Sequence, residues 1–433
     1  MKKVLQKGDK KLLNSWAFYD WANSVYSLVI ASAIFPIFYD AIFEIKGIDT
    51  LVVFGKEWKS SSLIFATTAV AFSVVAIISP LLSGVADFLG NKKFFLKLFC
   101  YLGALSTIGL YLFSIDHIYV SLSCYFLALI GFWGSLVFYN SYLPDIANKD
   151  QHDSISAKGF SLGYVGSVIL LIACLALIMS QENGEDKVKM MRWSFVLTGV
   201  WWIVFSQYTY IYLPKGNKSD GKLSKNVFYQ GFRELKAIWV EMQHKPRLKG
   251  YLIAFFVYSM GVQTVMLAAA YFGAEELDWG ETDKTLGLIT SILLIQLVAV
   301  LGAFLTSKLS SKIGNINALI VINLIWIAIC AWAFFVYTPI QFYITAGVVG
   351  LVMGGVQALS RSTYAKFLPE TDDTTSYFSF YDVSEKIGIV FGMLMFLAMQ
   401  ELTGSMRYSI IFLILFFGVG VLLLRRVPKE GKE

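Results

Sequence analysis

The stretch SGVADFLGNKKFFL, residues 83–96, is a short polar turn between two long apolar runs. Gly90 can adopt the tight backbone turn that joins two helix ends, and Lys92 and Lys93 can anchor the turn at anionic lipid headgroups. Asp87 can pair with a cation or with a helix N-terminus across an interface. We therefore expect two membrane helices joined at a membrane surface, with Asp87, Gly90 and Lys92 as gate residues that help to control conformation.

The composition of the whole chain agrees with this reading of the turn. Of 433 residues, 57% are hydrophobic and 15% are charged, and the mean hydropathy is +0.63. Soluble domains carry about 25% charged residues, so this chain has too little polar surface for a water-soluble globule of its length. A helix that crosses a bilayer needs about 20 mostly apolar residues. Such segments lie near 15–42, 62–85, 94–115, 118–141, 157–180, 192–213, 248–273, 285–309, 316–337, 340–366, 377–402 and 405–425.

The positive charges predict the orientation of these twelve expected helices. The net charge is +6, and the Lys and Arg residues gather before the first helix, in the 83–96 turn, in 214–249 and after the last helix. The loop GAEELDWGETDK (273–284) is acidic instead. Because cytoplasmic segments are rich in Lys and Arg, both termini are expected in the cytoplasm. Short loops favour the bacterial cytoplasmic membrane over an organelle for this multi-pass protein.

A weak internal repeat predicts two halves. YLPDI (142–146) and FLPET (367–371) end the fourth and tenth helices, and SKLSSKIGNIN (307–317) repeats the 83–96 turn, with Ser311 in place of Asp87. Because the second turn lacks this acid, we expect the contacts that control conformation to differ between the two halves. Parallel six-helix repeats around a central site are a transporter architecture. We expect an N-terminal bundle (1–213), a cytoplasmic linker (214–247) and a C-terminal bundle (248–433) related by pseudo-symmetry.

The linker contains its own helical pattern. In KNVFYQGFRELKAIWVEM (225–242), apolar residues recur at helical spacing. They are Phe228, Phe232, Leu235, Ile238 and Trp239. The pattern predicts an amphipathic helix, which could lie on the inner leaflet or serve as a soluble linker helix.

Four further segments, together with the 83–96 turn, carry a family resemblance. They are FYDWANSVYSLVI (18–30), GVQTV (261–265), GGVQALSRSTYAKFLPE (354–370) and FSFYDVSEKIG (378–388). The chain resembles the vacuole effluxer family of the major facilitator superfamily, in the form of a bacterial-type member. That family includes autophagy-related vacuolar amino-acid exporters of fungi. In the loop signature of the superfamily, Ser83 replaces the usual first Gly and Phe88 replaces the usual cation. Met260 stands where bacterial relatives of the family often carry an acid.

The resemblance implies a fold and a function. The fold is the all-α major facilitator fold of twelve transmembrane helices in two six-helix bundles. The function is secondary active transport, by alternating access, of small polar metabolites. Amino acids are the substrate class it suggests, export is the direction, and proton coupling stays open.

The resemblance also implies which residues line the cavity, because helices one, four, seven and ten do so in this superfamily. Their polar residues are Asp20, Asn23, Tyr139, Asn140, Gln263, Thr264, Gln357 and Arg361. Asp20 and Asn23 are three residues apart and share one helix face. Asp20 could pair with a gate cation or take up a proton. Alternatively, it lies at headgroup depth, with Trp16 and Trp21 as interfacial anchors.

A second charged group lies in the eleventh expected helix. Asp382 and Lys386 are four residues apart and can pair on one face, with Glu385 beside them. Together with Arg361 they make two cations and two anions near the cytoplasmic end. This group could be a gate that breaks and reforms, or a static structural network.

Several classes of function lack support. The four cysteines lie in apolar runs without metal-ligand spacing, and no phosphate-binding loop is present. We expect no enzyme, no catalytic residues, no metal, no cofactor and no nucleic-acid partner. The expected partners are a small polar solute, protons and the lipid bilayer, and the expected state is a monomer. A membrane receptor or scaffold on a transporter fold remains the alternative.

Overall fold

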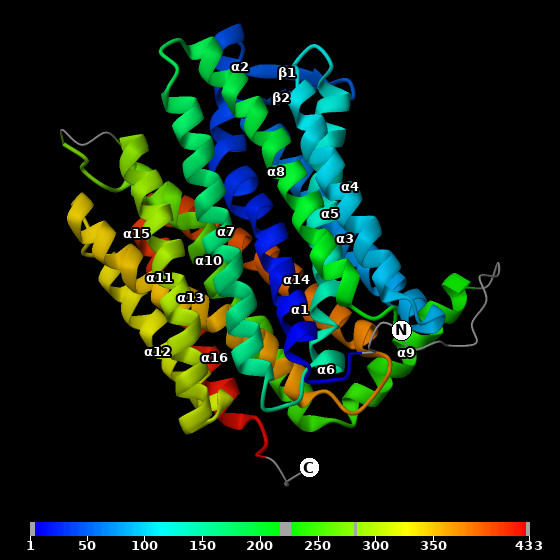
Figure 1. Ribbon diagram of the computed structural model, residues 1–433. Helices are drawn as coiled ribbons and strands as arrows, with labels where there is room; N and C mark the ends of the chain where they lie inside the picture. Colours follow the sequence, from blue (N-terminus) through cyan, green and yellow to red (C-terminus); the bar gives the residue numbers. More distant parts are fainter. Residues whose placement is uncertain (1–4, 217–226, 281–283, 430–433) are drawn as a thin grey trace.

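The computed structural model describes residues 5–216, 227–280 and 284–429. Long helices running side by side make up most of this part of the chain (Figure 1). The α-helices are α1 (Lys10–Val25), α2 (Phe35–Lys46), α3 (Ser60–Leu89), α4 (Lys92–Gly109), α5 (Ile118–Asn140), α6 (Leu143–Ile146), α7 (His152–Met179), α8 (Gly184–Tyr212), α9 (Val227–Gln243), α10 (Pro246–Glu275), α11 (Lys284–Ile313), α12 (Asn315–Ala333), α13 (Pro339–Phe367), α14 (Thr374–Thr403), α15 (Met406–Phe412) and α16 (Ile414–Arg426). The remaining elements are the π-helix η1 (Tyr26–Ile34), the 3-10 helix η2 (Leu110–Leu112) and the strands β1 (Thr50–Val53) and β2 (Lys56–Lys59).

The expected helical membrane fold is confirmed, whereas the exact number of crossings is not. Within the described ranges, ten helical segments are long and apolar enough to cross a membrane. The two further expected spans, α8 and α14, form as helices of 29 and 30 residues but lie outside these ten. α8 carries Glu185 and Asp186 in its first turn, and α14 carries the charged group around Lys386. Charged residues therefore lower the mean hydropathy of both helices.

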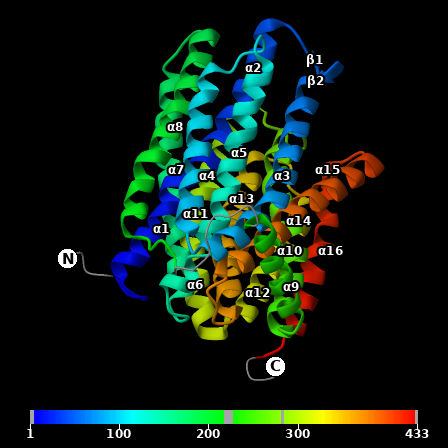
Figure 2. The same cartoon turned by 90° about the vertical axis from the view of Figure 1, so that its right-hand side faces the viewer.

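A β-hairpin interrupts the helical pattern after the first span, where the sequence predicts only a loop. β1 and β2 pair antiparallel, with Val53 opposite Lys56. Phe54 and Gly55 form the two-residue turn with φ of 51° and 73°, as tight hairpin loops with two positive φ values require. Figure 2 shows the hairpin at the end of the bundle opposite to the end of α16.

The first span is a continuous helix with a π-helical middle. α1, η1 and α2 follow one another without a break from Lys10 to Lys46. The N–H of Phe35 donates to the carbonyl of Ile30, five residues back, which is the π pattern. Pro36, the second residue of α2, has no N–H to donate. The sequence predicts a span here but not this change of helix type.

Helix packing brings early and late segments of the chain together. α1 packs against α7 and α8, and α4 packs against α5 and α8. In the later part, α10 packs against α14 and α16, and α11 against α13. α3 crosses over to α14, and α7 contacts both α11 and α13. These last contacts join the two parts of the chain; the exact boundaries of two bundles stay a prediction.

The linker helix α9 packs along α3. Leu235, Ile238 and Met242 are buried, whereas Phe232 and Trp239 are more than half exposed. The side chain of Phe228 lies outside the described part of the chain. Two of the expected apolar positions therefore pack on the protein, and two are exposed. Its position on the inner leaflet stays a prediction.

Candidate functional site

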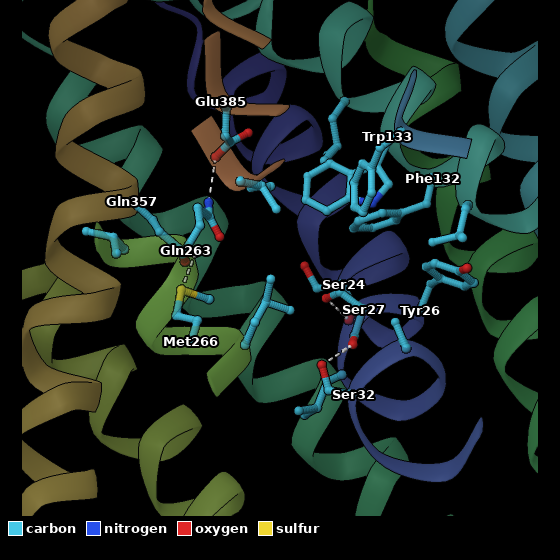
Figure 3. Close-up of a pocket in the computed structure, with 18 of the residues that line it drawn as sticks. Ser24, Tyr26, Ser27, Ser32, Phe132, Trp133, Gln263, Met266, Gln357 and Glu385 are labelled. Atoms are coloured by element: carbon cyan, nitrogen blue, oxygen red, sulfur yellow. Dashed lines mark hydrogen bonds between the residues drawn. The ribbon is translucent and has the colours of Figure 1, made fainter. Parts of the chain in front are cut away.

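A cavity of about 570 Å³ lies among the first span, α3, α5, α7, α10, α13 and α14. Its volume is in the range of small-molecule sites. Of the residues expected to line a cavity, six do so: Asp20, Asn23, Asn140, Gln263, Gln357 and Arg361. Figure 3 shows part of the wall, with Gln263, Gln357 and Glu385 on one side and Phe132 and Trp133 on another. One site thus draws on helices from both ends of the sequence.

Two of the expected cavity residues have other positions. The hydroxyl of Tyr139 donates a hydrogen bond to the Asp20 carboxylate, 2.8 Å away, from behind the cavity wall. Thr264 is fully buried, and its hydroxyl lies where a Cβ at Gly392 would be, so it belongs to the contact between α10 and α14. Tyr139 supports the site indirectly, and Thr264 serves helix packing.

The cavity is exposed at one end and closed at the other. Asp40 and Ser61 line the exposed end, on the side of the β-hairpin. Asp20 and Arg361 line the opposite end and are only 4% and 3% exposed. Among the described residues, the side chains at the hairpin end are therefore open to a solute, and those at the Asp20–Arg361 end are closed to it.

Arg361 closes the buried end by contacts with three other helices. Its Nη2 lies 3.2 Å from Asp20 Oδ2 on α1, and its Nη1 donates to Asn140 Oδ1 on α5 at 3.2 Å. Its Nε donates to Ser156 Oγ on α7 at 3.0 Å, and Nη2 also donates to the Ser156 carbonyl. A buried charge requires such pairing and hydrogen bonding, because its desolvation is costly. The guanidinium of α13 therefore holds α1, α5 and α7 together at one point.

Aromatic rings surround this ion pair. The guanidinium carbon of Arg361 lies 4.2 Å from the Phe160 ring centroid and 4.8 Å from that of Trp16. Trp16 is fully buried and stacks on Tyr139. Trp16 and Asp20 therefore lie inside the bundle. The depth of Asp20 in the membrane, with Trp16 and Trp21 as interfacial anchors, stays a prediction.

The charged group on α14 divides differently from the expected four-residue cluster. Lys386 is bonded to Asp382 and lies 3.2 Å from Glu385 Oε2. Gln263 Nε2 on α10 donates to Glu385 Oε1 at 2.8 Å. Arg361 has its own partner in Asp20, so the predicted group of two cations and two anions is two separate groups. Glu385 lines the cavity, whereas Asp382 and Lys386 are buried behind it.

The turn between α3 and α4 fastens the beginning of α14. Gly90 ends α3 in a left-handed conformation, with φ of 60°. The Asp87 carboxylate accepts from the backbone N–H of Ser376 at 2.6 Å, in the first turn of α14, where a negative charge is favourable. Lys92 pairs with Asp145 and donates to Thr374 Oγ1 at 2.9 Å. We call Asp87, Lys92, Asp145 and their α14 partners the Asp87 cluster.

A second cluster closes the same end of the bundle in the other half. Asp153, in the first turn of α7, accepts from Lys366 Nζ at 2.6 Å and from Ser310 Oγ at 2.9 Å. Asn315 Nδ2 donates to the other Asp153 oxygen at 2.9 Å. We call these four residues the Asp153 cluster. The missing acid at Ser311 is thus replaced by a carboxylate from α7, so the second connection differs in the origin of its acid rather than in lacking one.

The linker helix adds two carboxyl groups beside the Asp87 cluster. Glu234 on α9 and Asp373, just before α14, are coupled by a side-chain hydrogen bond. Burial raises the pKa of Glu234, and the nearby charge of Asp373 raises it further. Burial also raises the pKa of Asp373. The pair therefore holds a proton more tightly than two solvated carboxyls would.

Sequence reasoning missed part of this network. Ser156 and Asp153 belong to none of the predicted motifs, and Asn315 and Lys366 appear only within longer ones, although each of the four contacts a partner on another helix. Asp153 and Lys366 carried a weak signal, since each is a charge within one or two turns of the end of an apolar run. Asn315 is the second residue of the repeated Gly-Asn pair, so the repeat pointed to its place but not to its partner.

Comparison with known proteins places the chain in a family. Residues 8–432 match the family described as "Vacuole effluxer Atg22 like". The chain belongs to this family. It is 30% identical to the "Uncharacterized MFS-type transporter YxiO" of Bacillus subtilis, over 98% of this chain and 97% of that protein. It is 24% identical to "Autophagy-related protein 22" of Kluyveromyces lactis, over 95% and 92% of the two chains.

Solved structures show the same fold for this vacuole effluxer family member. The fucose transporter FucP in the outward conformation matches with a TM-score of 0.69 at 14% identity, over 97% of this chain and 98% of that chain. The proton:xylose symporter XylE matches with a TM-score of 0.67 at 11% identity, over 96% and 95%. The fold is therefore that of the major facilitator superfamily, as the sequence motifs predicted.

Proposed function

We propose that this protein is a secondary transporter that exports small polar metabolites, amino acids in particular, by alternating access. One observation carries the proposal. A cavity of about 570 Å³ is exposed at one end and closed at the other by the Asp20–Arg361 pair, which bridges α1 and α13. The name of the Bacillus relative as a transporter and the vacuole effluxer family support the same function.

The proposal includes the membrane arrangement. We add α8 and α14 to the ten apolar segments as spans eleven and twelve, with six in residues 1–213 and six in 248–433, joined by the linker 214–247. With both termini in the cytoplasm, the closed end faces the cytoplasm and the exposed end faces outward. The protein then works as a monomer in the bacterial cytoplasmic membrane.

Opening toward the cytoplasm requires the contacts between helices of the two halves to break. The Asp20–Arg361 pair, the Asp87 cluster and the Asp153 cluster all join an early helix to a late one. Asp382 and Lys386, by contrast, lie on one helix, and Glu385 contacts α10 of the same half. The Lys386 ammonium does reach the other half, 4.1 Å from the ring centroid of Trp133 on α5, but the ion pairs of the α14 group lie within one half. Those ion pairs can therefore stay formed while the two halves separate.

Proton coupling would act through Asp20. Protonation removes the negative charge that pairs with Arg361 and so weakens the closed end. A proton taken up from the exposed side would thereby favour opening toward the cytoplasm, where the substrate to be exported binds. The XylE neighbour is named as a proton symporter, which agrees with a proton gradient as the energy source in this fold.

The test is flux of a labelled amino-acid panel in proteoliposomes, with and without an imposed pH gradient. We expect flux that follows the gradient and a loss of this dependence in Asp20→Asn. Asp116→Asn is a matched control, since Asp116 is an exposed loop acid whose side chain, among the described residues, contacts Lys46 and Ser114. Flux that is independent of the pH gradient would contradict proton coupling and leave a facilitator. A folded protein that binds amino acids without moving any would instead be a receptor or scaffold.

A further inference from the structure

The cavity wall carries an excess of negative charge. Among the described residues, its charged side chains are Asp20, Asp40, Arg361 and Glu385. Asp20 and Arg361 neutralise each other in their ion pair. Asp40 remains near the exposed end, and Glu385 remains deeper in the cavity. A solute in this cavity therefore meets unbalanced carboxylates.

The cations near the cavity are already engaged. The donors of Arg361 go to Asp20, Asn140 and Ser156, with Nη2 making two of these bonds. Lys386 is only 1% exposed and is held by Asp382 and Glu385, with its ammonium 4.1 Å from the Trp133 ring centroid. A carboxylate of a solute would thus find no free cation on the described part of the wall.

Glu385, in contrast, has acceptor capacity to spare. A carboxylate has about four lone-pair sites, and the described contacts of Glu385 are one bond from Gln263 and the 3.2 Å contact with Lys386. Because Lys386 also serves Asp382, the group of three has a net charge of −1. The Glu385 side chain is 20% exposed and lines the cavity. Gln263 fixes its orientation from the neighbouring helix (Figure 3).

The surroundings of Glu385 also suit an ammonium group. Tyr258 and Tyr381 line the cavity together with it, and both lie near enough to interact with its charge. Aromatic faces attract cations through their quadrupole, most strongly where water is excluded. An ammonium group donates three hydrogen bonds. The Glu385 carboxylate, the Gln263 amide oxygen and nearby hydroxyls can accept them.

We propose that Glu385, oriented by Gln263, binds a protonated amine of the transported substrate and so selects amine-bearing compounds against anions. This inference rests on the proposed transport function and narrows its substrate class. For an amino acid, the amine is the recognised group, and the carboxylate is left to neutral donors. Asn23 is the candidate donor, since this residue lines the cavity and its buried Nδ2 has no hydrogen-bond partner among the described residues. An organic cation should therefore bind more tightly than the matching zwitterion.

The test uses purified full-length protein and three probes with the same carbon skeleton but different charge. They are leucinamide, leucine and 2-hydroxy-4-methylpentanoate, and their affinity is measured by isothermal titration calorimetry. We expect leucinamide to bind tightest, leucine more weakly and the hydroxy acid not at all. Glu385→Gln should weaken leucinamide binding at least tenfold. Equal binding of the hydroxy acid and leucine, an unchanged affinity in Glu385→Gln, or binding of none of the three would overturn the proposal.

Two further variants separate charge from folding. Glu385→Asp keeps the charge and should retain part of the leucinamide affinity, whereas Asp116→Asn removes a remote acid and should retain all of it. Calorimetry needs no flux, so selective amine binding without transport would sink the transport function alone. If Glu385→Gln bound leucinamide normally but lost its response to a pH gradient, Glu385 would be a proton carrier, and this inference would be wrong.

Discussion

Gly159 on α7 lies directly against the carboxylate of Asp20 on α1. A Cβ at position 159 would overlap Asp20 Oδ2 and would stand 3.1 Å from Arg361 Nη2. The ion pair at the closed end of the cavity therefore occupies the space that a side chain on α7 would need. The Gly159/Gly163 spacing is typical of close helix packing, and here the packed groups include a buried charge pair.

Gly159→Ala should separate Asp20 from Arg361. We expect overpacking to cost about 1–3 kcal/mol and to lower both the thermal midpoint and the flux. Gly347→Ala in α13 is the matched control, because a Cβ there meets nothing within 4 Å. That change should be neutral or stabilise by about 0.5–1 kcal/mol, the usual helix preference for Ala over Gly. Equal midpoints of both variants would contradict the crowding described at Gly159.

Removal of one partner from the Asp20–Arg361 pair should destabilise the protein more than removal of both. Asp20→Asn leaves a buried guanidinium without its counter-charge, and breaking a buried pair costs about 3–5 kcal/mol. The double variant Asp20→Asn/Arg361→Gln should recover part of this loss. A double-mutant cycle on denaturant unfolding measures the coupling, and strictly additive effects would show that the two charges do not interact.

Disruption of the Asp153 cluster should loosen the closed end. Asp153→Asn removes the carboxylate bonded to Lys366, and charge-assisted hydrogen bonds are worth about 1.5–3 kcal/mol. A cysteine at the buried position Thr363, which contacts Asn315, reports the opening through its rate of maleimide labelling. The half-buried Cys124 is first replaced by serine. We expect faster labelling in Asp153→Asn.

The control for this experiment is Ser311→Ala, at the position where the sequence repeat would place an acid. The Ser311 hydroxyl donates to the Lys308 carbonyl of its own helix, so its loss should leave labelling unchanged. If Ser311→Ala accelerated labelling as much as Asp153→Asn, the closure would not depend on the α7 carboxylate.

The contact of the linker helix with α14 should weaken as the pH rises. Glu234 and Asp373 both have raised pKa values, so the docked state binds protons more tightly than the undocked state. Docking is therefore strongest below the ordinary carboxyl pKa of about 4 and weakens as the pH rises through the raised values. Arg233, Asp372 and Glu241 also face this pair.

Fluorescence of Trp239, whose ring centroid lies 5.6 Å from that of Phe380 on α14, can report this docking in a variant stripped of other tryptophans near α9. The signal should titrate in the parent protein and lose most of its pH dependence in Glu234→Gln. An unchanged titration in Glu234→Gln would assign the effect to another group.

The sequence predicted the long helices well because apolar runs of about 20 residues admit few other structures in a bilayer protein. The π-helix and the hairpin were not predicted, because they depend on backbone hydrogen bonds that the composition does not reveal. For the site, family-based placement found Asp20, Gln263 and Arg361. The partners within the site could not be predicted, because the sequence offers several acids that could pair with Lys366. Only the tertiary packing brings Asp153 to it.

The π-helix in the first span determines which face of α2 is turned toward the cavity. Each residue of an α-helix turns the chain by about 100°, and a wider turn accommodates additional residues before the helix resumes. Pro36, Tyr39 and Asp40 on α2 all line the cavity and lie beyond Tyr26–Ile34. Loss of a single residue from that segment would leave the hydrophobic length almost unchanged yet present another face of α2 to the solute. The π-helical segment thus helps to determine which side chains a substrate contacts at the exposed end of the cavity.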